Sequence, residues 1–259
     1  MPRACAYCGS GGPLTREHLF PEFIMRLHPT YRTYLSASLP GLVTTKSPVV
    51  RDVCRLCNNG RLSVLDNYGR SLCSSYLRRF VKPGELGMLS YDFHMLARWL
   101  WKVHYNTARS GDAGPGTYKA LVPYILGDAT APPTPQTLLV GVLKADTATD
   151  VERAALHSRF FYPRAVRYAD ATLGRFHMLA RLRRSLSINS YIFWSILWTE
   201  GPSRVERKEA AKELAVALGM VVLSEVGGRA MIPESPFPGF AVRTYLTTRT
   251  WPILPTAGP

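Results

Sequence analysis

The stretch that decides the fold is Cys5-Ala-Tyr-Cys8, which is followed after 45 intervening residues by Cys54-Arg-Leu-Cys57. Each C-x-x-C knuckle presents two thiolates on a tight turn. Two such knuckles supply the four ligands of a tetrahedral Zn²⁺ site, which in this arrangement is structural and closed to substrate. We therefore predict a structural zinc site formed by Cys5, Cys8, Cys54 and Cys57, which pins two distant segments together.

Polar residues that could take part in a reaction lie beside both knuckles. Glu17-His18 stands between them, and Asn58-Asn59 directly follows the second. Neither segment could place these side chains near one point alone, but a shared metal site would. We therefore expect Glu17, His18 and Asn58 to lie close together.

Composition indicates a folded protein that does not cross a membrane. The chain has 259 residues, of which 46% are hydrophobic, and this is enough for a sizeable core. The N-terminus lacks the apolar segment of a signal peptide, so the cysteines are interpreted as metal ligands and not as disulfides. The most apolar stretch, Tyr191 to Trp198, is far shorter than the roughly 20 residues that span a bilayer. We expect a cytoplasmic location.

The net charge of +14 favours a polyanionic partner. Residues 1–83 carry 12 Lys and Arg against 4 Asp and Glu, so more than half of the excess lies in the third that also holds the paired cysteines. A generally basic protein with many arginines is the alternative. An anionic membrane surface is less favoured, because no strongly basic amphipathic helix stands out. We expect nucleic acid as the partner.

The predicted fold class is α+β with two domains, residues 1–83 and residues 84–259. In the first, Leu39 to Val53 predicts a strand of a hairpin and Asn58 to Phe80 a helix, which ends before Lys82-Pro83-Gly84. Cys73 falls on this helix and is expected to be a buried small hydrophobic residue.

The second predicted domain is a larger, mixed α+β unit. It begins with an amphipathic helix over Leu89 to Arg109, along which Arg98, Lys102 and Arg109 are expected to form a solvated face, or else to follow phosphates. We expect no second catalytic site here, and a role in substrate positioning, oligomerisation or regulation. A helix is predicted over Val205–Leu218, and strands are predicted over Thr137–Leu143, Ala165–Tyr168, Ile188–Trp198, Met220–Leu223 and Arg243–Leu254.

The order C-x-x-C, Glu-His, C-x-x-C-Asn resembles the HNH endonucleases, also called His-Me finger or ββα-metal nucleases. The resemblance covers about residues 3–67 and is carried by three segments, which are Cys5-Ala-Tyr-Cys-Gly9, Leu14-Thr-Arg-Glu-His-Leu-Phe-Pro21 and Cys54-Arg-Leu-Cys-Asn-Asn-Gly60. It implies that residues 1–83 form a β-hairpin and a helix that grip one divalent cation.

The resemblance also implies a role for each polar residue. His18 would be the general base that deprotonates water, and Glu17 and Asn58 would hold Mg²⁺ or Mn²⁺. Neighbouring residues on an extended strand point to opposite sides, so Glu17 can face the metal while His18 faces the water. A neutral imidazole can accept a proton near pH 7. Such an enzyme cuts phosphodiester bonds, and DNA is favoured over RNA as the expected substrate. Association with the family suggests phage defence or mobile-element biology.

The chain departs from the family pattern at one point. The family usually has an Asn a few residues before the second knuckle, where it orients the base, but residues 42–53 contain none. Thr44, Thr45 or Ser47 could take that place. Asn59 is the alternative metal ligand to Asn58, and both could instead cap a helix or form a turn.

Two other functions stay open from the sequence. The first is a non-catalytic zinc module that only binds nucleic acid. The second is an effector whose function lies in residues 84–259, with the zinc unit serving as structure. An acid-His pair favours the nuclease over the first, because binding alone does not require it. The unassigned residues 84–259 keep the second open, and they could also form a homodimer or bind a protein partner.

Overall fold

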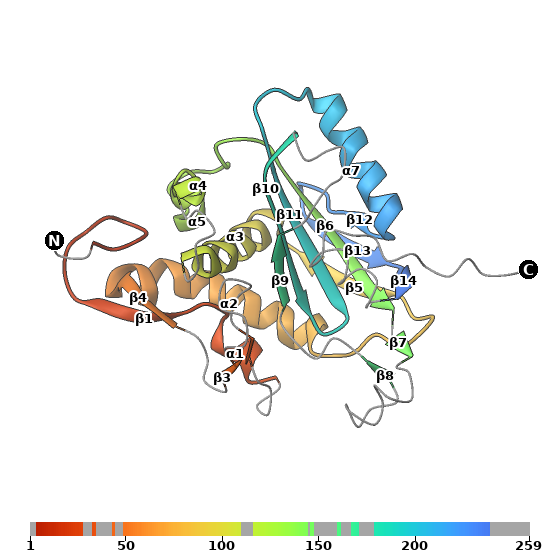
Figure 1. Cartoon of the computed structure of the whole chain (residues 1–259), viewed down its shortest axis with the longest axis horizontal. Helices are drawn as coiled ribbons and strands as arrows, with labels where there is room; N and C mark the ends of the chain where they lie inside the picture. The colour runs from red at the N-terminus through yellow and green to blue at the C-terminus, as the bar shows by residue number, and fades with distance from the viewer. Residues whose placement is uncertain are drawn as a thin grey trace, which may run out of the picture. The chain divides into compact units, whose positions relative to one another are not determined.

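The computed structural model contains both helices and strands, which confirms the α+β class (Figure 1). It falls into two compact units. These units differ from the predicted domains 1–83 and 84–259, because the helix that ends at Arg109 lies in the first unit. The units comprise residues 1–75, 91–135 and 225–228, and residues 76–90, 136–224 and 229–259. The residues described are 4–27, 33–34, 43–44, 49–109, 116–144, 146–147, 160–161, 167–170 and 179–238.

The first unit is built on an antiparallel pair of strands, β1 (Leu14–His18) and β4 (Val49–Cys54). Leu14 lies opposite Cys54 and His18 opposite Val49, so both ends of the pair lie next to residues of the candidate site. The register shifts between Thr15 and Glu17, which marks a bulge. The strand expected over Leu39 to Val53 is confirmed from Val49 onward, and it ends on the first cysteine of the second knuckle. Val43–Thr44 is a separate strand, β3, and the other residues of the predicted range lie outside the described residues.

A nearly continuous helical run follows the second knuckle, close to the predicted Asn58–Phe80. It begins with a π-helical segment, η1 (Cys57–Leu62), continues as α2 (Ser63–Leu72) and ends in η2 (Cys73–Leu77). Its apolar positions, among them Leu62 and Leu65, are buried, and so is Cys73, as predicted. Asn58 thus occupies the first turn of the run.

The long helix α3 (Phe93–Arg109) packs directly against α2. Gly69 marks the close approach, because a Cβ atom there would lie 2.4 Å from the Trp99 indole. The predicted helix over Leu89 to Arg109 is confirmed from Phe93 onward, whereas its first residues belong to strand β5 (Gly87–Tyr91). The first unit also contains α1 (Glu22–Met25), β2 (Thr33–Tyr34), β3 (Val43–Thr44), α4 (Gly116–Lys119) and α5 (Val122–Leu126).

The second unit is a six-stranded sheet with one helix on a face, α7 (Arg204–Leu218) (Figure 1). Alternate residues of the central strands pack against that helix, for example Trp194 and Trp198 against Leu214. Ser203 and Glu206 form a capping box that fixes where the helix begins. The strands are β6 (Gln136–Lys144), β9 (Arg167–Asp170), β10 (Ala180–Ile188), β11 (Tyr191–Trp198), β12 (Val221–Val222) and β14 (Glu234–Pro238).

The sheet confirms most of the strands predicted for this part of the chain. Strand β10 was not predicted, apart from its last residue, Ile188. The predicted strand over Arg243 to Leu254 lies outside the described residues. Within the described residues, no helix has the length and apolar character needed to cross a membrane. The remaining strands are β7 (Asp146–Thr147), β8 (Phe160–Phe161) and β13 (Gly228–Ile232).

Candidate metal centre and candidate active site

The four paired cysteines form one cluster, as the spacing predicts. The sulfur atoms of Cys5, Cys8, Cys54 and Cys57 all lie within 4.8 Å of one another, and those of Cys8 and Cys54 are 3.6 Å apart. Four thiolates on one zinc ion with bonds of about 2.3 Å would be separated by about 3.8 Å. The cluster therefore has the dimensions to hold a metal ion such as zinc.

Backbone contacts shape both knuckles for this cluster. The N–H of Cys54 donates to the Cys5 sulfur at 3.3 Å, and the N–H of Cys57 donates to the Cys54 sulfur at 3.5 Å. Gly9 closes the first knuckle at φ +73°, a conformation that a side chain would disfavour. Hydrogen bonds with Ser10 lower the pKa of the Cys8 thiol to about 6. The cluster is thus organised by its own turns, and one thiol is readily ionised.

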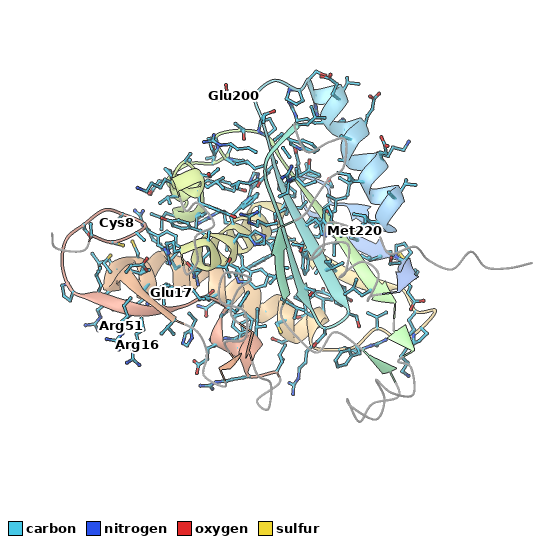
Figure 2. The ribbon with its side chains drawn as sticks, in the orientation of Figure 1. Cys8, Arg16, Glu17, Arg51, Glu200 and Met220 are labelled. Carbon is cyan, nitrogen blue, oxygen red and sulfur yellow. The ribbon has the colours of Figure 1, made fainter. Side chains whose placement is uncertain are left out.

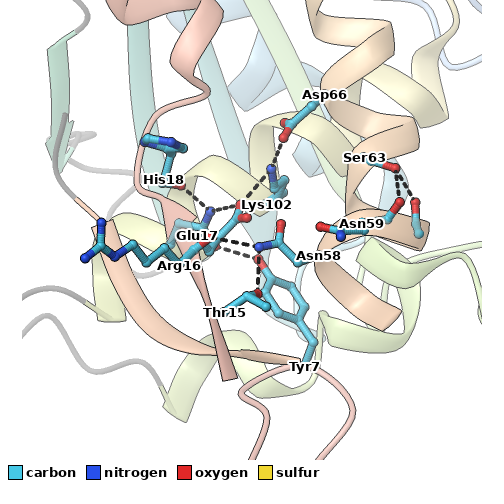
Figure 3. Close-up of polar contacts among 12 residues, drawn as sticks. Tyr7, Thr15, Arg16, Glu17, His18, Asn58, Asn59, Ser63, Asp66 and Lys102 are labelled. Atoms are coloured by element: carbon cyan, nitrogen blue, oxygen red, sulfur yellow. Dashed lines mark hydrogen bonds and ion pairs between the residues drawn. The ribbon is translucent and has the colours of Figure 1, made fainter. Parts of the chain in front are cut away.

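Asn58 lies against the strand that carries Glu17 and His18. Its Nδ2 donates to Thr15 Oγ1 at 2.9 Å and to the Arg16 carbonyl at 2.8 Å, across about forty residues of sequence (Figure 3). Neither bond uses Oδ1, which is the atom that could ligate a cation. The structure therefore brings Asn58 to β1, the strand that ends at the half-buried His18.

The Glu17 carboxylate is buried, with only 4% of the residue exposed. Its Oε1 accepts a hydrogen bond from Asn106 Nδ2 at 2.9 Å and lies 2.8 Å from Lys102 Nζ (Figure 3). The Lys102 ammonium also contacts Asp66 Oδ2 at 2.6 Å. One lysine therefore bridges two carboxylates.

This bridge also affects the second acid. Burial raises the pKa of Asp66 above its ordinary value, and the attraction of Lys102 partly opposes that rise. An unpaired ammonium with 1% of its side chain exposed would be strongly unfavourable. The contacts with the two acids therefore compensate for the burial of the Lys102 side chain.

The predicted solvated face of Arg98, Lys102 and Arg109 is wrong for the last two residues. The side chains of Lys102 and Arg109 are 1% and 5% exposed. Arg109 contacts Asp52 at 3.3 Å and stacks over the rings of Tyr7 and Tyr105. The polar stripe of α3 is buried because the acids of the first unit lie against it. Only Arg98 stays partly exposed, and its Nε donates to the Ile125 carbonyl.

The donor atoms near Glu17 suit a hard divalent cation in kind, because Mg²⁺ takes carboxylate and amide oxygens together with water. Glu17 and Asn58 each have an oxygen that the contacts above do not use. The ammonium of Lys102 would repel a divalent cation beside Glu17. The Asp66 carboxylate, which contacts Lys102, reduces this repulsion. Asn59 is exposed, and its carbonyl accepts from Ser63 in the same helical run at 2.8 Å.

Most of the residues considered as substitutes for the missing Asn lie outside the described residues. Thr45 and Ser47 fall outside the described residues, and for Thr44 only the backbone strand β3 is described. The sequence reasoning missed Lys102 and Asn106, both on α3. The sequence carries no signal for them, because the contacts of Glu17, Asp52 and Asp66 with that helix are seen only in the structure.

Two arginines stand on the outer side of the hairpin. Arg16 and Arg51 are exposed, and Figure 2 shows both side chains extending away from the strands in the same direction. In the part of the chain that is described, neither forms a salt bridge. This surface beside His18 could contact phosphates.

Comparison with protein-family models, with curated proteins and with solved structures gives no match.

Proposed function

We propose that the first unit is a metal-dependent HNH-type endonuclease that hydrolyses phosphodiester bonds in DNA, with a structural Zn²⁺ on the four cysteines. The observation that carries the proposal is the pair of hydrogen bonds from Asn58 to β1. Through them, the helix after the second knuckle lies against the strand of Glu17 and His18. The cysteine cluster, the antiparallel hairpin and the helix occur in the order that the resemblance implies.

The proposed reaction divides the work between three side chains. His18 accepts a proton from the attacking water, while Glu17 and Asn58 would hold Mg²⁺ or Mn²⁺. A bound divalent cation stabilises negative charge on the scissile phosphate and on the leaving oxygen. The contacts of Glu17 with Lys102 and Asn106 fix the direction of its carboxylate.

The basic charge supports a nucleic-acid substrate. Arg16 and Arg51 extend beside the strand that ends at His18, where each could contact a phosphate (Figure 2). Residues 1–83 carry eight of the fourteen net positive charges. The backbone of a nucleic acid would therefore be drawn to the same side of the hairpin.

One observation favours a second candidate function, a zinc module that binds nucleic acid without cutting it. Glu17 is 4% exposed and already bonded to Lys102 and Asn106, which is typical of a structural carboxylate. In that case Glu17 would hold the fold together and would bind no catalytic ion.

Incubation of the purified chain with supercoiled plasmid distinguishes the two functions. The nuclease converts plasmid to nicked or linear forms with Mg²⁺ or Mn²⁺, and EDTA abolishes this. Asn58→Ala should weaken metal binding, so that cleavage requires a higher concentration of Mg²⁺ or Mn²⁺. The matched control is Asn67→Ala, which replaces an exposed Asn on α2. Retention of plasmid on the protein without cleavage under any of these metals would favour the binding module.

A further inference from the structure

Asn106 is a buried side-chain amide whose hydrogen-bonding capacity is completely used. Nδ2 donates to Glu17 Oε1 and to the His18 carbonyl, both at 2.9 Å. Oδ1 accepts from the Tyr7 hydroxyl at 2.7 Å and from Arg109 Nη2 at 2.8 Å. A side-chain amide has two donor hydrogens and two acceptor lone pairs, and here each has a partner.

The partners fix which end of the amide faces the candidate site. Arginine can only donate, so the oxygen of Asn106 must face Arg109. The NH₂ group must then face Glu17 and His18, where it meets a carboxylate and a carbonyl. The orientation is therefore determined by the chemistry of its neighbours.

The hydrogen bonds of Asn106 reach the end of β1, just after an irregularity in its pairing with β4. β1 has a register shift between Thr15 and Glu17, and it ends at His18. Across this shift one residue of β1 lies opposite two residues of β4, so the pairing is irregular just before Glu17. Asn106 bonds the side chain of the residue after the bulge and the main chain of the last strand residue, so it holds both in place.

We propose that Asn106 is a positioning residue for His18 and Glu17, an inference that rests on the proposed nuclease function. The resemblance implies an Asn before the second knuckle that orients the base, but residues 42–53 contain none. Asn106 orients the base from α3 instead. It acts through the strand and touches no substrate. Loss of such a supporting partner typically reduces activity by about 10–100-fold.

A purely structural role for Asn106 predicts a different pattern, and two variants separate the roles. Asn106→Asp has the same shape and still accepts from Tyr7 and Arg109, but at neutral pH it cannot donate to Glu17 or His18. Tyr7→Phe does the opposite, because it removes a bond on the oxygen side and leaves both donated bonds intact. Zinc content and thermal unfolding establish that each variant is folded.

The test measures kcat and KM for plasmid nicking with Mn²⁺, together with the imidazole NMR signals of His18 in ¹³C-histidine-labelled protein. We expect Asn106→Asp to lower kcat by about 10–100-fold with little change in KM, and to shift the His18 signals. Tyr7→Phe should change neither. Unchanged kcat in Asn106→Asp overturns the inference, as does an equal loss in both variants that follows their stability.

Failure of the proposed function is recognised separately. If the wild-type protein does not cut, the nuclease proposal fails, and the NMR signals then decide on Asn106 alone. A shift of the His18 signals in Asn106→Asp but not in Tyr7→Phe supports the positioning role. Unshifted signals in both contradict it.

Discussion

Replacing Lys102 by Met tests the buried ion bridge that joins α3 to the hairpin and to α2. The change keeps the length of the side chain but removes the charge that lies 2.8 Å from Glu17 and 2.6 Å from Asp66. Removing one partner of a buried pair leaves uncompensated charge and costs about 3–5 kcal/mol. The control is Lys119→Met, because Lys119 is exposed and its loss should change the unfolding free energy by less than about 0.5 kcal/mol.

Urea unfolding followed by tryptophan fluorescence measures the difference, because Trp99 and Trp101 are buried on α3 itself. Adding Glu17→Gln to Lys102→Met should restore part of the loss, because one of the two unpaired carboxylates is then neutral. A Lys102→Met variant as stable as the Lys119→Met control would refute the bridge.

The pH dependence gives a second check with a definite sign. Asp66 already has a raised pKa because of burial, and loss of the Lys102 charge raises it further. The native variant then binds a proton more readily than the unfolded chain does. The unfolding free energy of the variant therefore rises as the pH falls from neutral. The stabilising contribution of Asp66 is lost as the pH rises through its pKa in the folded variant. The gap to wild type should narrow at lower pH, with Glu17 and Arg70 as the other charged groups near Asp66. A widening gap would contradict this.

Three further outcomes are expected. Cys57→Ser should release zinc and unfold the first unit, since structural zinc contributes on the order of 10–16 kcal/mol in small modules; elemental analysis and circular dichroism measure this, and an unchanged zinc content would be contrary to it. Gly69→Ala should destabilise by about 1–3 kcal/mol through overpacking, whereas Gly60→Ala, with open space around it, should stabilise the helix or leave it unchanged, as thermal unfolding would show. The double variant Arg16→Ala with Arg51→Ala should reduce the slope of log K against log salt by about 1.8 for duplex DNA, and an unchanged slope in fluorescence anisotropy would remove this pair from the interface.

The local parts of the candidate site could be predicted from the sequence. The C-x-x-C spacing specifies four thiols on two turns, and the sulfur atoms lie within 4.8 Å of one another. The apolar repeat after Cys57 specifies a helix, and Asn58 occupies its first turn. These features depend on residues close in sequence or on a spacing that metal geometry dictates.

The contribution of α3 could not be predicted in the same way. Lys102, Asn106 and Arg109 follow each other at helical spacing and have the pattern of a solvated face. They are buried because Glu17, Asp66 and Asp52 meet them from other elements. Only tertiary packing decides whether such a stripe faces water or carboxylates.

The most direct test of the nuclease proposal is plasmid cleavage by wild type and His18→Ala under identical conditions, with Mn²⁺ and with zinc content verified in both. The account predicts that wild type nicks the plasmid and that His18→Ala is slower by about 10²–10⁴-fold, the usual contribution of a positioned acid or base. It also predicts that both proteins bind DNA equally well. Equal cleavage rates for the two proteins, or no cleavage by wild type, would contradict it.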